Sequence, residues 1–163
     1  ISKMKEIRVG NGFDVHKLSV GKKIKLCGVE IKNNKKLIGH SDADVGLHSL
    51  TDAILGALGK GDIGIWFPPS QNKWKNIDSA IFLKKSLQLL KKNNFFISNI
   101  DLTFICEKPK ISDFRNSMIK KISKICNLDT RKINIKATTS EKLGYTGREE
   151  GIAVFTTVLI YKK

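Results

Sequence analysis

Apolar residues recur at steps of three and four between residues 47 and 58, a spacing typical of an amphipathic α-helix. The stripe on its buried face consists of Leu47, Leu50, Ile54, Ala57 and Leu58. A polar stretch that begins at residue 40 precedes this stripe, so we predict a loop that leads into the helix, with Ser41 or Asp42 as the N-cap. We expect the rest of the chain to be organised around this loop and helix.

Two later segments have the same helical spacing. Residues 78–93 and 113–127 each place apolar side chains on one face, and Asp78 is the expected N-cap of the first. The glycine-rich residues 59–64 would end the central helix in a flexible turn.

Five segments have the alternating or apolar patterns of strands: residues 7–16, 22–31, 100–107, 133–137 and 151–161. The glycines of the first segment indicate a bulge or a close backbone approach, and Gly28 marks a turn in the second. The order strand-strand-helix-helix-strand-helix-strand-strand predicts a layered α/β (α+β) fold, in which a mixed β-sheet is covered by helices on one face. With no repeat and no internal boundary, we expect a single domain over residues 1–163.

Composition excludes several classes of protein. No apolar run approaches the roughly 20 residues that span a bilayer, so we expect a soluble protein with no membrane partner. The net charge of +15 would suit nucleic acid, but the lysines are scattered and no nucleic-acid-binding motif accompanies them, so we expect no nucleic-acid partner. The 3 cysteines are widely spaced, which argues against a disulfide framework or a thiolate zinc site and favours a reducing compartment.

Three residues form a candidate metal centre. Asp14 and His16 are two apart in a strand, so both side chains point to the same side of the sheet. His48 lies on the central helix between Asp44 and Asp52, which are four residues away on either side and could hold its ring in one tautomer. Each motif alone is also compatible with a solvated polar surface. Together, one oxygen and two nitrogens are the ligand set of a catalytic zinc site with one position left open.

A second group of residues suits phosphate. The hydroxyls and turn amides near Thr138 and Thr139 could hold phosphate oxygens, and Glu141 could bind a hard cation such as Mg²⁺. Pro109 would end the strand before it and free backbone groups for a ligand, while Lys110 suits a phosphate. Asp62, between two glycines, could bind substrate hydroxyls or serve only as a turn residue. An open zinc site beside a phosphate cradle indicates phosphoryl chemistry.

Four segments together resemble the 2-C-methyl-D-erythritol 2,4-cyclodiphosphate synthase family. They are residues 8–16, 39–45, 61–68 and 136–144, in the order and spacing of the family, and the resemblance extends from about residue 7 to residue 161. It implies a cyclising phosphorus–oxygen lyase that converts 4-diphosphocytidyl-2-C-methyl-D-erythritol 2-phosphate into the 2,4-cyclodiphosphate and releases CMP, in the non-mevalonate (MEP) pathway of isoprenoid biosynthesis. The alternatives are a zinc-dependent phosphohydrolase and a basic binding module with a structural metal.

The resemblance also implies roles for individual residues. Asp14, His16 and His48 would hold one Zn²⁺ per subunit, and Glu141 would hold Mg²⁺ or Mn²⁺ with the substrate. His40 and Ser41 would contact the 2-phosphate end, and Asp62 and Gly64 the methylerythritol hydroxyls. The cytidine and phosphate side would comprise Cys106, Pro109, Lys110, Lys136, Ala137, Thr138 and Thr139, with Thr139 nearest the phosphates. Tyr145 and Arg148, which match a family motif near a trimer axis, would also bind substrate.

The family forms homotrimers whose active sites lie between subunits, so the resemblance implies that two chains contribute to each site. It implies a bacterial cytoplasm or, if a transit peptide preceded Ile1, a plastid stroma.

Overall fold

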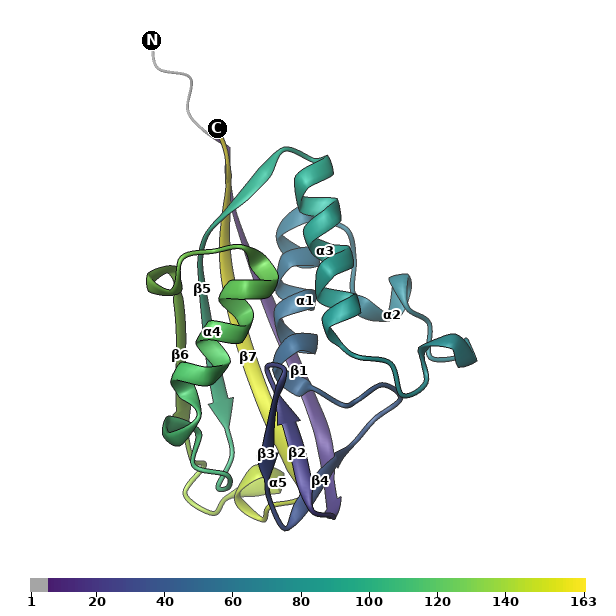
Figure 1. Cartoon of the computed structure of the whole chain (residues 1–163), viewed down its shortest axis with the longest axis vertical. Coiled ribbons are helices and arrows are strands. Elements are labelled where there is room, and N and C mark those ends of the chain that lie inside the picture. Colours follow the sequence, from purple (N-terminus) through teal and green to yellow (C-terminus); the bar gives the residue numbers. More distant parts are fainter. Residues whose placement is uncertain (1–5) are drawn as a thin grey trace.

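The computed structural model describes residues 6–163, which form a mixed β-sheet with helices on one of its faces (Figure 1). The sheet has the strand order β4-β1-β7-β5-β6. Its strands are β1 (Ile7–Val20), β4 (Lys35–Ile38), β5 (Phe95–Ile105), β6 (Ile133–Thr138) and β7 (Gly151–Lys162). β5 and β6 are parallel, and the other neighbours are antiparallel, so the predicted mixed sheet is confirmed.

Three helices cover one face of the sheet: α1 (Val45–Leu58), α3 (Ala80–Lys92) and α4 (Arg115–Cys126). α1 packs on β1 and β7, α3 on α1, and α4 on β6. The core lies between these two layers, where the apolar stripe of α1 is almost completely buried. Two short helices, α2 (Ile63–Trp66) and α5 (Gly144–Gly147), lie in loops, as do 3₁₀ turns at Asn72–Trp74, Ile111–Asp113 and Thr130–Lys132.

The close approach that the glycines of β1 indicate is present. An ideal Cβ on Gly10 would lie 1.9 Å from the carbonyl oxygen of Ala53, and one on Gly12 would lie 1.8 Å from that of Ser49. No side chain fits at either position, so α1 lies directly against the strand. Asp14 and His16 follow on the same face of β1, and this contact brings His48 toward them.

The opposite face of the sheet is not covered by α1, α3 or α4 (Figure 1) and is apolar where β1 meets β7. Phe13 is 46% exposed and Phe155 is 50% exposed, and their rings pack 4.8 Å apart. Val15 extends this patch along β1, and Val9 lies on the same face beyond the polar pair of Asn11 and Thr157. An exposed aromatic and aliphatic patch of this kind is typical of an interaction surface.

The structure corrects four details of the predicted elements. Residues 22–31 are not one strand but a hairpin of β2 (Lys23–Leu26) and β3 (Val29–Lys32), separate from the main sheet. β4 was not predicted, because four residues at a sheet edge are too few for alternation to show. The expected flexible turn after α1 contains the helix α2. The N-cap of α1 is Asp44 rather than Ser41 or Asp42.

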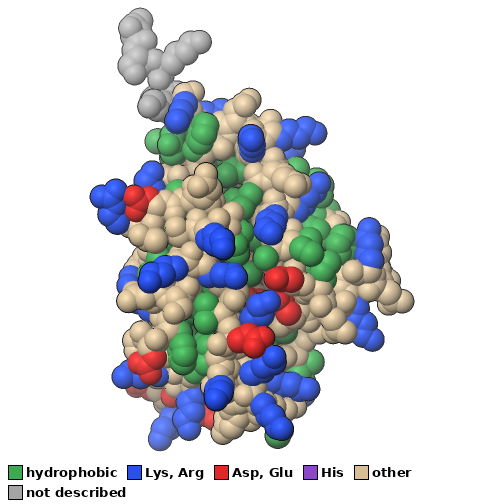
Figure 2. Space-filling model, in the orientation of Figure 1, with side chains coloured by type: hydrophobic (Ala, Val, Ile, Leu, Met, Phe, Trp, Pro, Cys, Tyr) green, Lys and Arg blue, Asp and Glu red, His purple; other side chains and the backbone are tan. Residues whose placement is uncertain are grey.

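Basic side chains are spread over the helical face rather than gathered in one stripe (Figure 2). A continuous basic stripe is the usual footprint of nucleic-acid binding, and this face has none among residues 6–163. Within the same residues, no helix combines the length and apolar character needed to cross a bilayer.

Candidate functional site

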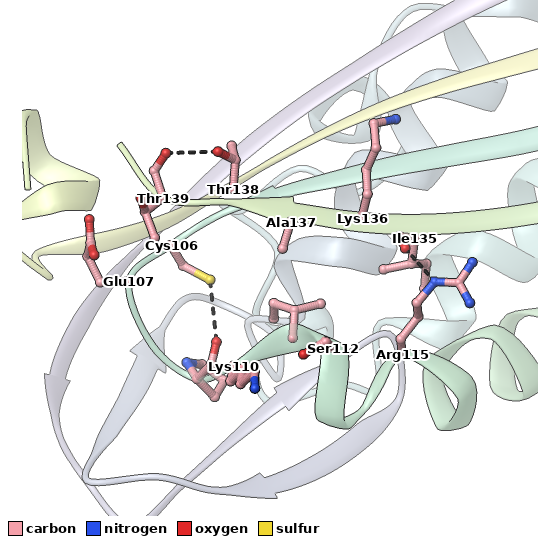
Figure 3. A pocket seen from close by; sticks show the side chains of 12 residues that line it. Cys106, Glu107, Lys110, Ser112, Arg115, Ile135, Lys136, Ala137, Thr138 and Thr139 are labelled. Atoms are coloured by element: carbon pink, nitrogen blue, oxygen red, sulfur yellow. Dashed lines mark hydrogen bonds between the residues drawn. The ribbon is translucent and has the colours of Figure 1, made fainter. Parts of the chain in front are cut away.

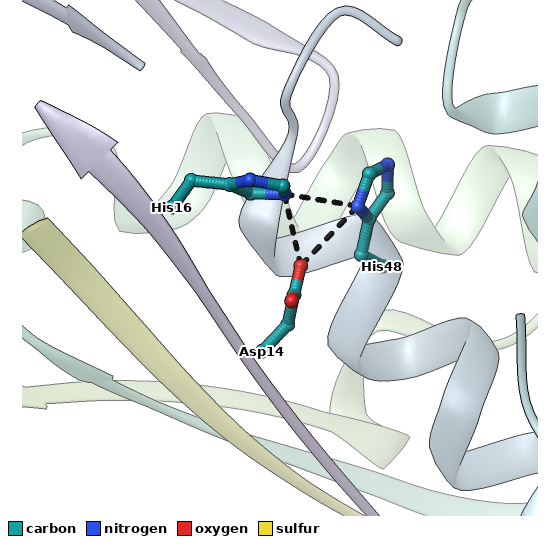
Figure 4. Close-up of side chains that lie close together, drawn as sticks. All are labelled: Asp14, His16 and His48. Atoms are coloured by element: carbon teal, nitrogen blue, oxygen red, sulfur yellow. Dashed lines mark hydrogen bonds and ion pairs between the residues drawn. The ribbon is translucent and has the colours of Figure 1, made fainter. Parts of the chain in front are cut away.

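Asp14, His16 and His48 converge on one point (Figure 4). Asp14 Oδ2 lies 3.0 Å from His16 Nε2 and 3.2 Å from His48 Nδ1, and the two ring nitrogens are 3.0 Å apart. The strand and helix periodicities predicted this convergence, and the structure brings the three side chains together. They are the only cluster of three or more metal-ligand side chains among residues 6–163.

The geometry fits a divalent metal. Bonds of about 2.0 Å at tetrahedral angles place neighbouring ligand atoms about 3.3 Å apart, close to the observed separations. Asp14 Oδ2 is buried and makes no well-aligned hydrogen bond to any residue of the described chain, although both rings are near it. The Asp14 oxygen and the two ring nitrogens therefore face one another with lone pairs available for a metal. This is the ligand set of an open zinc site.

Electrostatics favours the ligating form of Asp14. Burial alone would raise the pKa of this carboxyl, but His16 and His48 lower the pKa to about 2. Asp14 is therefore ionised at neutral pH, and a carboxylate must be ionised to bind a metal.

The other ring nitrogen of His48 faces two serines. His48 Nε2 lies 2.7 Å from Ser79 Oγ and 3.0 Å from Ser41 Oγ. Ser79 precedes α3 and is fully buried. Ser79 could not be identified from the sequence, because it is 31 residues from His48 and serine is common at the start of a helix.

The predicted role of Asp44 and Asp52 in holding the His48 ring is wrong. Asp44 instead accepts a backbone N–H group at the start of α1 and two more from the β2–β3 turn, at 2.7–3.1 Å. Asp52 Oδ1 accepts the backbone N–H of Ile63 at 2.8 Å and so ties α2 to α1. An N-cap side chain folds back over its own first turn, which leaves Asp44 unable to reach the ring.

Asp42 completes the surroundings of Ser79. Its carboxylate accepts the hydroxyl and, at 3.1 Å, the backbone N–H of Ser79, and it pairs with Lys25 Nζ at 3.1 Å. Burial raises the pKa of Asp42, but the bonds from Ser79 and Lys25 lower it below its usual value. The carboxylate is therefore an ionised acceptor near neutral pH.

A second site is a hollow of about 270 Å³ between the ends of β5 and β6 and the start of α4 (Figure 3). It contains the residues expected on the cytidine and phosphate side, together with others. Its lining is Cys106, Glu107, Pro109, Lys110, Ile111, Ser112, Arg115, Ile135, Lys136, Ala137, Thr138 and Thr139.

Arg115 is a lining residue that the sequence prediction missed. Its Nε donates to the carbonyl oxygen of Ile135 at 2.7 Å, which fixes the guanidinium at the wall of the hollow. Lys136, by contrast, extends away from Ser112 and Arg115 (Figure 3) and pairs with Asp101 Oδ2 at 2.6 Å. The alternation of β6 explains this, since Ala137 and Lys136 point to opposite faces.

The loop after β6 holds Glu141. The Glu141 backbone N–H donates to Thr139 Oγ1 at 3.3 Å, and the next amide, of Lys142, donates to Glu107 Oε1 at 3.1 Å. Glu141 and Lys142 both have positive φ, 52° and 63°, so the loop turns sharply beside the hollow. The Glu141 side chain is exposed, and it is not part of the Asp14, His16 and His48 cluster.

The remaining predicted residues lie at the surface. His40 is exposed just before the loop to α1. Asp62 caps α2 by accepting the N–H group three residues later at 3.0 Å, which is the ordinary turn role, and Gly64 is exposed in that helix. Tyr145 borders a shallow hollow that also contains His16, and Arg148 forms an ion pair with the glutamate two positions later.

The metal cluster and the hollow are far apart within one chain. In the strand register, Asp14 on β1 lies opposite Val154 on β7, Val154 opposite Phe104 on β5, and Phe104 opposite Ala137 on β6. These four residues therefore form one row across the sheet. Three strand spacings of about 4.8 Å separate Asp14 from Ala137 by about 14 Å. The two sites are therefore not adjacent halves of one cleft in a single chain.

The fold and the site together describe an α+β protein with a cluster of candidate metal ligands. A separate hollow in this protein is lined by cationic and hydroxyl side chains. The sequence pattern of the YgbB family matches residues 7–161. The chain therefore belongs to the YgbB family.

Similar proteins of two lengths are known. The 2-C-methyl-D-erythritol 2,4-cyclodiphosphate synthase of Cereibacter sphaeroides is 50% identical over 155 residues, which cover 95% of this chain and 98% of that protein. The bifunctional enzyme IspD/IspF of Paracoccus denitrificans is 51% identical over 96% of this chain, and the chain spans only 41% of its length.

Among solved structures, IspF of Plasmodium falciparum in a CDP complex has a TM-score of 0.86 and 42% identity, over 96% of this chain and 97% of that one. The bifunctional IspDF of Campylobacter jejuni has a TM-score of 0.93 and 44% identity, over 98% of this chain and 43% of that one.

Proposed function

We propose that this chain converts 4-diphosphocytidyl-2-C-methyl-D-erythritol 2-phosphate into 2-C-methyl-D-erythritol 2,4-cyclodiphosphate and CMP, as a cyclising phosphorus–oxygen lyase of isoprenoid biosynthesis. The observation that carries the proposal is the Asp14, His16 and His48 cluster in a chain that is 50% identical to a synthase of similar length.

The reaction needs no nucleophile from the protein. An oxygen of the substrate's 2-phosphate attacks the β-phosphorus, a new P–O bond forms, and the bond from that phosphorus to the bridging oxygen breaks, so that CMP leaves with the bridging oxygen. The protein's task is to fold a flexible polyanion into the reactive geometry and to balance its charge.

The residues divide this task between the two sites. Asp14, His16 and His48 would hold Zn²⁺ and Glu141 would hold Mg²⁺ or Mn²⁺; when bound, these ions supply positive charge to the phosphate oxygens. Ser41 offers a buried hydroxyl beside His48, and His40 lies one residue earlier at the surface, which suits the 2-phosphate end. Asp62 and Gly64 would face the methylerythritol hydroxyls.

The hollow suits the cytidine diphosphate part of the substrate. Similar structures of this family have been solved with CDP, including that of Plasmodium falciparum IspF. The Thr138 and Thr139 hydroxyls can donate to phosphate oxygens, and Lys110 and Arg115 add positive charge at the wall. We assign no contact to Lys136, whose amine is already paired with Asp101.

A homotrimer would complete the site. The separation of about 14 Å between Asp14 and Ala137 leaves the two halves apart in one chain. The apolar patch around Phe13 and Phe155 is a suitable interface, because burying it removes exposed aromatic surface from water. In this assembly the metal cluster of one chain faces the hollow of a neighbour.

Phosphorus NMR of turnover tests the proposal. Incubation with the cytidyl substrate, Zn²⁺ and Mg²⁺ should give a cyclic diphosphate and CMP in equal amounts, and Asp14→Ala should give neither. Release of inorganic phosphate would instead indicate a phosphohydrolase, and metal binding without any turnover would indicate a binding module.

A further inference from the structure

Ser79 lies at the centre of a buried hydrogen-bond network that starts at His48. Its hydroxyl is 2.7 Å from His48 Nε2, bonds the Asp42 carboxylate, and is 3.2 Å from the hydroxyl of Ser41. Ser79 is fully buried, yet its side chain does not cap α3. A buried serine whose hydroxyl faces a histidine instead of capping its helix has another role.

The donor and acceptor in the bonds among His48, Ser79 and Asp42 follow from which of these groups carries a proton to donate. His48 Nδ1 is the atom that faces Asp14 and His16, so metal binding requires a lone pair there and the proton on Nε2. The ionised Asp42 can only accept, so the Ser79 hydroxyl must donate to it. Ser79 therefore accepts from His48 Nε2, which selects the tautomer that can bind a metal.

The Asp42 end of this hydrogen-bond network is held in place by other contacts. Asp42 is held by the backbone N–H of Ser79 and by Lys25 on β2, so its position does not depend on the hydroxyl alone. His16 has no comparable support, since no side chain of residues 6–163 hydrogen-bonds its Nδ1. The support is thus specific to the ligand on α1.

We propose that Ser79 is a positioning residue for the metal centre: with Asp42, it keeps His48 in the Nε2–H tautomer and fixes the orientation of the ring. The second ring nitrogen of a metal-bound histidine usually donates directly to a carboxylate or carbonyl oxygen. Here it donates to the Ser79 hydroxyl, which in turn donates to the Asp42 carboxylate. Because His48 is a metal ligand in the proposed function, this inference rests on that metal site but not on the reaction.

Zinc affinity, measured by competition with a chromophoric chelator, is the first test. Loss of an outer partner of this kind typically weakens binding 10- to 100-fold, and we expect about tenfold for Ser79→Ala because Ser41 can accept part of the hydrogen bond from His48 Nε2 in its place. Ser79→Thr keeps the hydroxyl and should restore most of the affinity. Ser86→Ala is the matched control, since Ser86 is a buried serine within α3 that bonds only the Leu83 carbonyl, and this variant should bind zinc like the wild type.

Nitrogen NMR of the metal-free protein is the second test, and it needs neither turnover nor zinc. In the metal-free protein, the ionised Asp14 carboxylate, 3.2 Å from His48 Nδ1, favours the Nδ1–H tautomer, and Ser79 favours the Nε2–H tautomer. The fraction of the Nε2–H tautomer should therefore be lower in Ser79→Ala than in the wild type and Ser86→Ala. Wild-type-like zinc affinity and tautomer in Ser79→Ala would overturn the inference while leaving the proposed function standing. An equal loss in Ser86→Ala would also overturn it, by showing that helix packing is responsible. Failure of the wild type itself to bind zinc would overturn the metal site.

Discussion

Gly12 and the backbone of Ser49 are so close that a methyl group cannot fit between them. An ideal Cβ on Gly12 would lie 1.8 Å from the Ser49 carbonyl oxygen, which is well inside van der Waals contact. This contact presses α1 onto β1 one residue from His48 and two from Asp14. The metal cluster therefore depends on a packing contact that contains no metal ligand.

Gly12→Ala should weaken both folding and metal binding. The added methyl must push α1 away from β1, and overpacking of this kind costs typically 1–3 kcal/mol in the free energy of unfolding. Because His48 moves with α1, zinc affinity should fall as well. Urea unfolding and zinc titration measure the two effects.

Gly56→Ala provides the control on the same helix. Its Cβ would lie 3.5 Å from the Asn11 carbonyl oxygen, an ordinary contact, and alanine is a better helix former than glycine by about 1 kcal/mol. This variant should be as stable as the wild type or more so, with unchanged zinc affinity. Equal behaviour of the two variants would show that the close approach at Gly12 is not important.

The sequence predicted those parts of the molecule that follow from local periodicity. Alternation put Asp14 and His16 on one face of a strand, and the three-to-four spacing put His48 on a helix, so their convergence could be anticipated. Spacing alone could not show that Asp44 and Asp52 do not hold the His48 ring, because both carboxylates accept backbone N–H groups instead. Ser79 reaches the site through tertiary packing of α3 on α1, which no local pattern encodes.

His48→Ala should remove bound zinc and turnover while leaving the fold intact. The substitution deletes one of three ligands, and the apolar stripe of α1 that packs in the core is untouched. Metal analysis should fall from about one zinc per chain to almost none, with an unchanged circular dichroism spectrum. His40→Ala removes an exposed imidazole outside the cluster and should retain zinc. Full zinc content in His48→Ala would contradict the ligand assignment.

Glu141→Gln should lower kcat more than it lowers substrate affinity. The carboxylate is proposed to hold the second ion, whose charge matters most as CMP leaves, and losing even part of several kcal/mol of such stabilisation reduces kcat at least about tenfold. Zinc content should not change, because Glu141 is outside the cluster. Steady-state kinetics over a magnesium titration measures this, and an unchanged kcat would exclude Glu141 from the mechanism.

Lys110→Ala should weaken binding of cytidine diphosphate to the hollow. The side chain is at the wall, and a hydrogen bond from a charged donor contributes about 1.5–3 kcal/mol, so Kd should rise about tenfold or more. Calorimetric titration with CDP tests this. Lys120→Ala, an exposed lysine on α4 outside the hollow, controls for the general loss of positive charge and should bind like the wild type. An equal loss in both variants would point to long-range attraction instead.

Asp44 should make stability depend on pH in the direction opposite to most carboxyls. Burial raises the pKa of Asp44 to about 6, although backbone N–H groups, first that of Gly28, favour its ionised form. In the unfolded chain the pKa of an aspartate is near 3.9. Between about pH 4 and pH 6 the folded protein therefore binds the Asp44 proton more tightly than the unfolded chain does. The free energy of unfolding consequently falls as pH rises, by up to ~3 kcal/mol from this group. Asp44→Asn cannot titrate and lacks this contribution. Urea unfolding of both metal-free proteins at fixed concentration should therefore show the wild type losing stability relative to Asp44→Asn as pH rises from 4 to 6. A difference between the two that stays constant over this range would show that the backbone donors fully offset the cost of burying the charge.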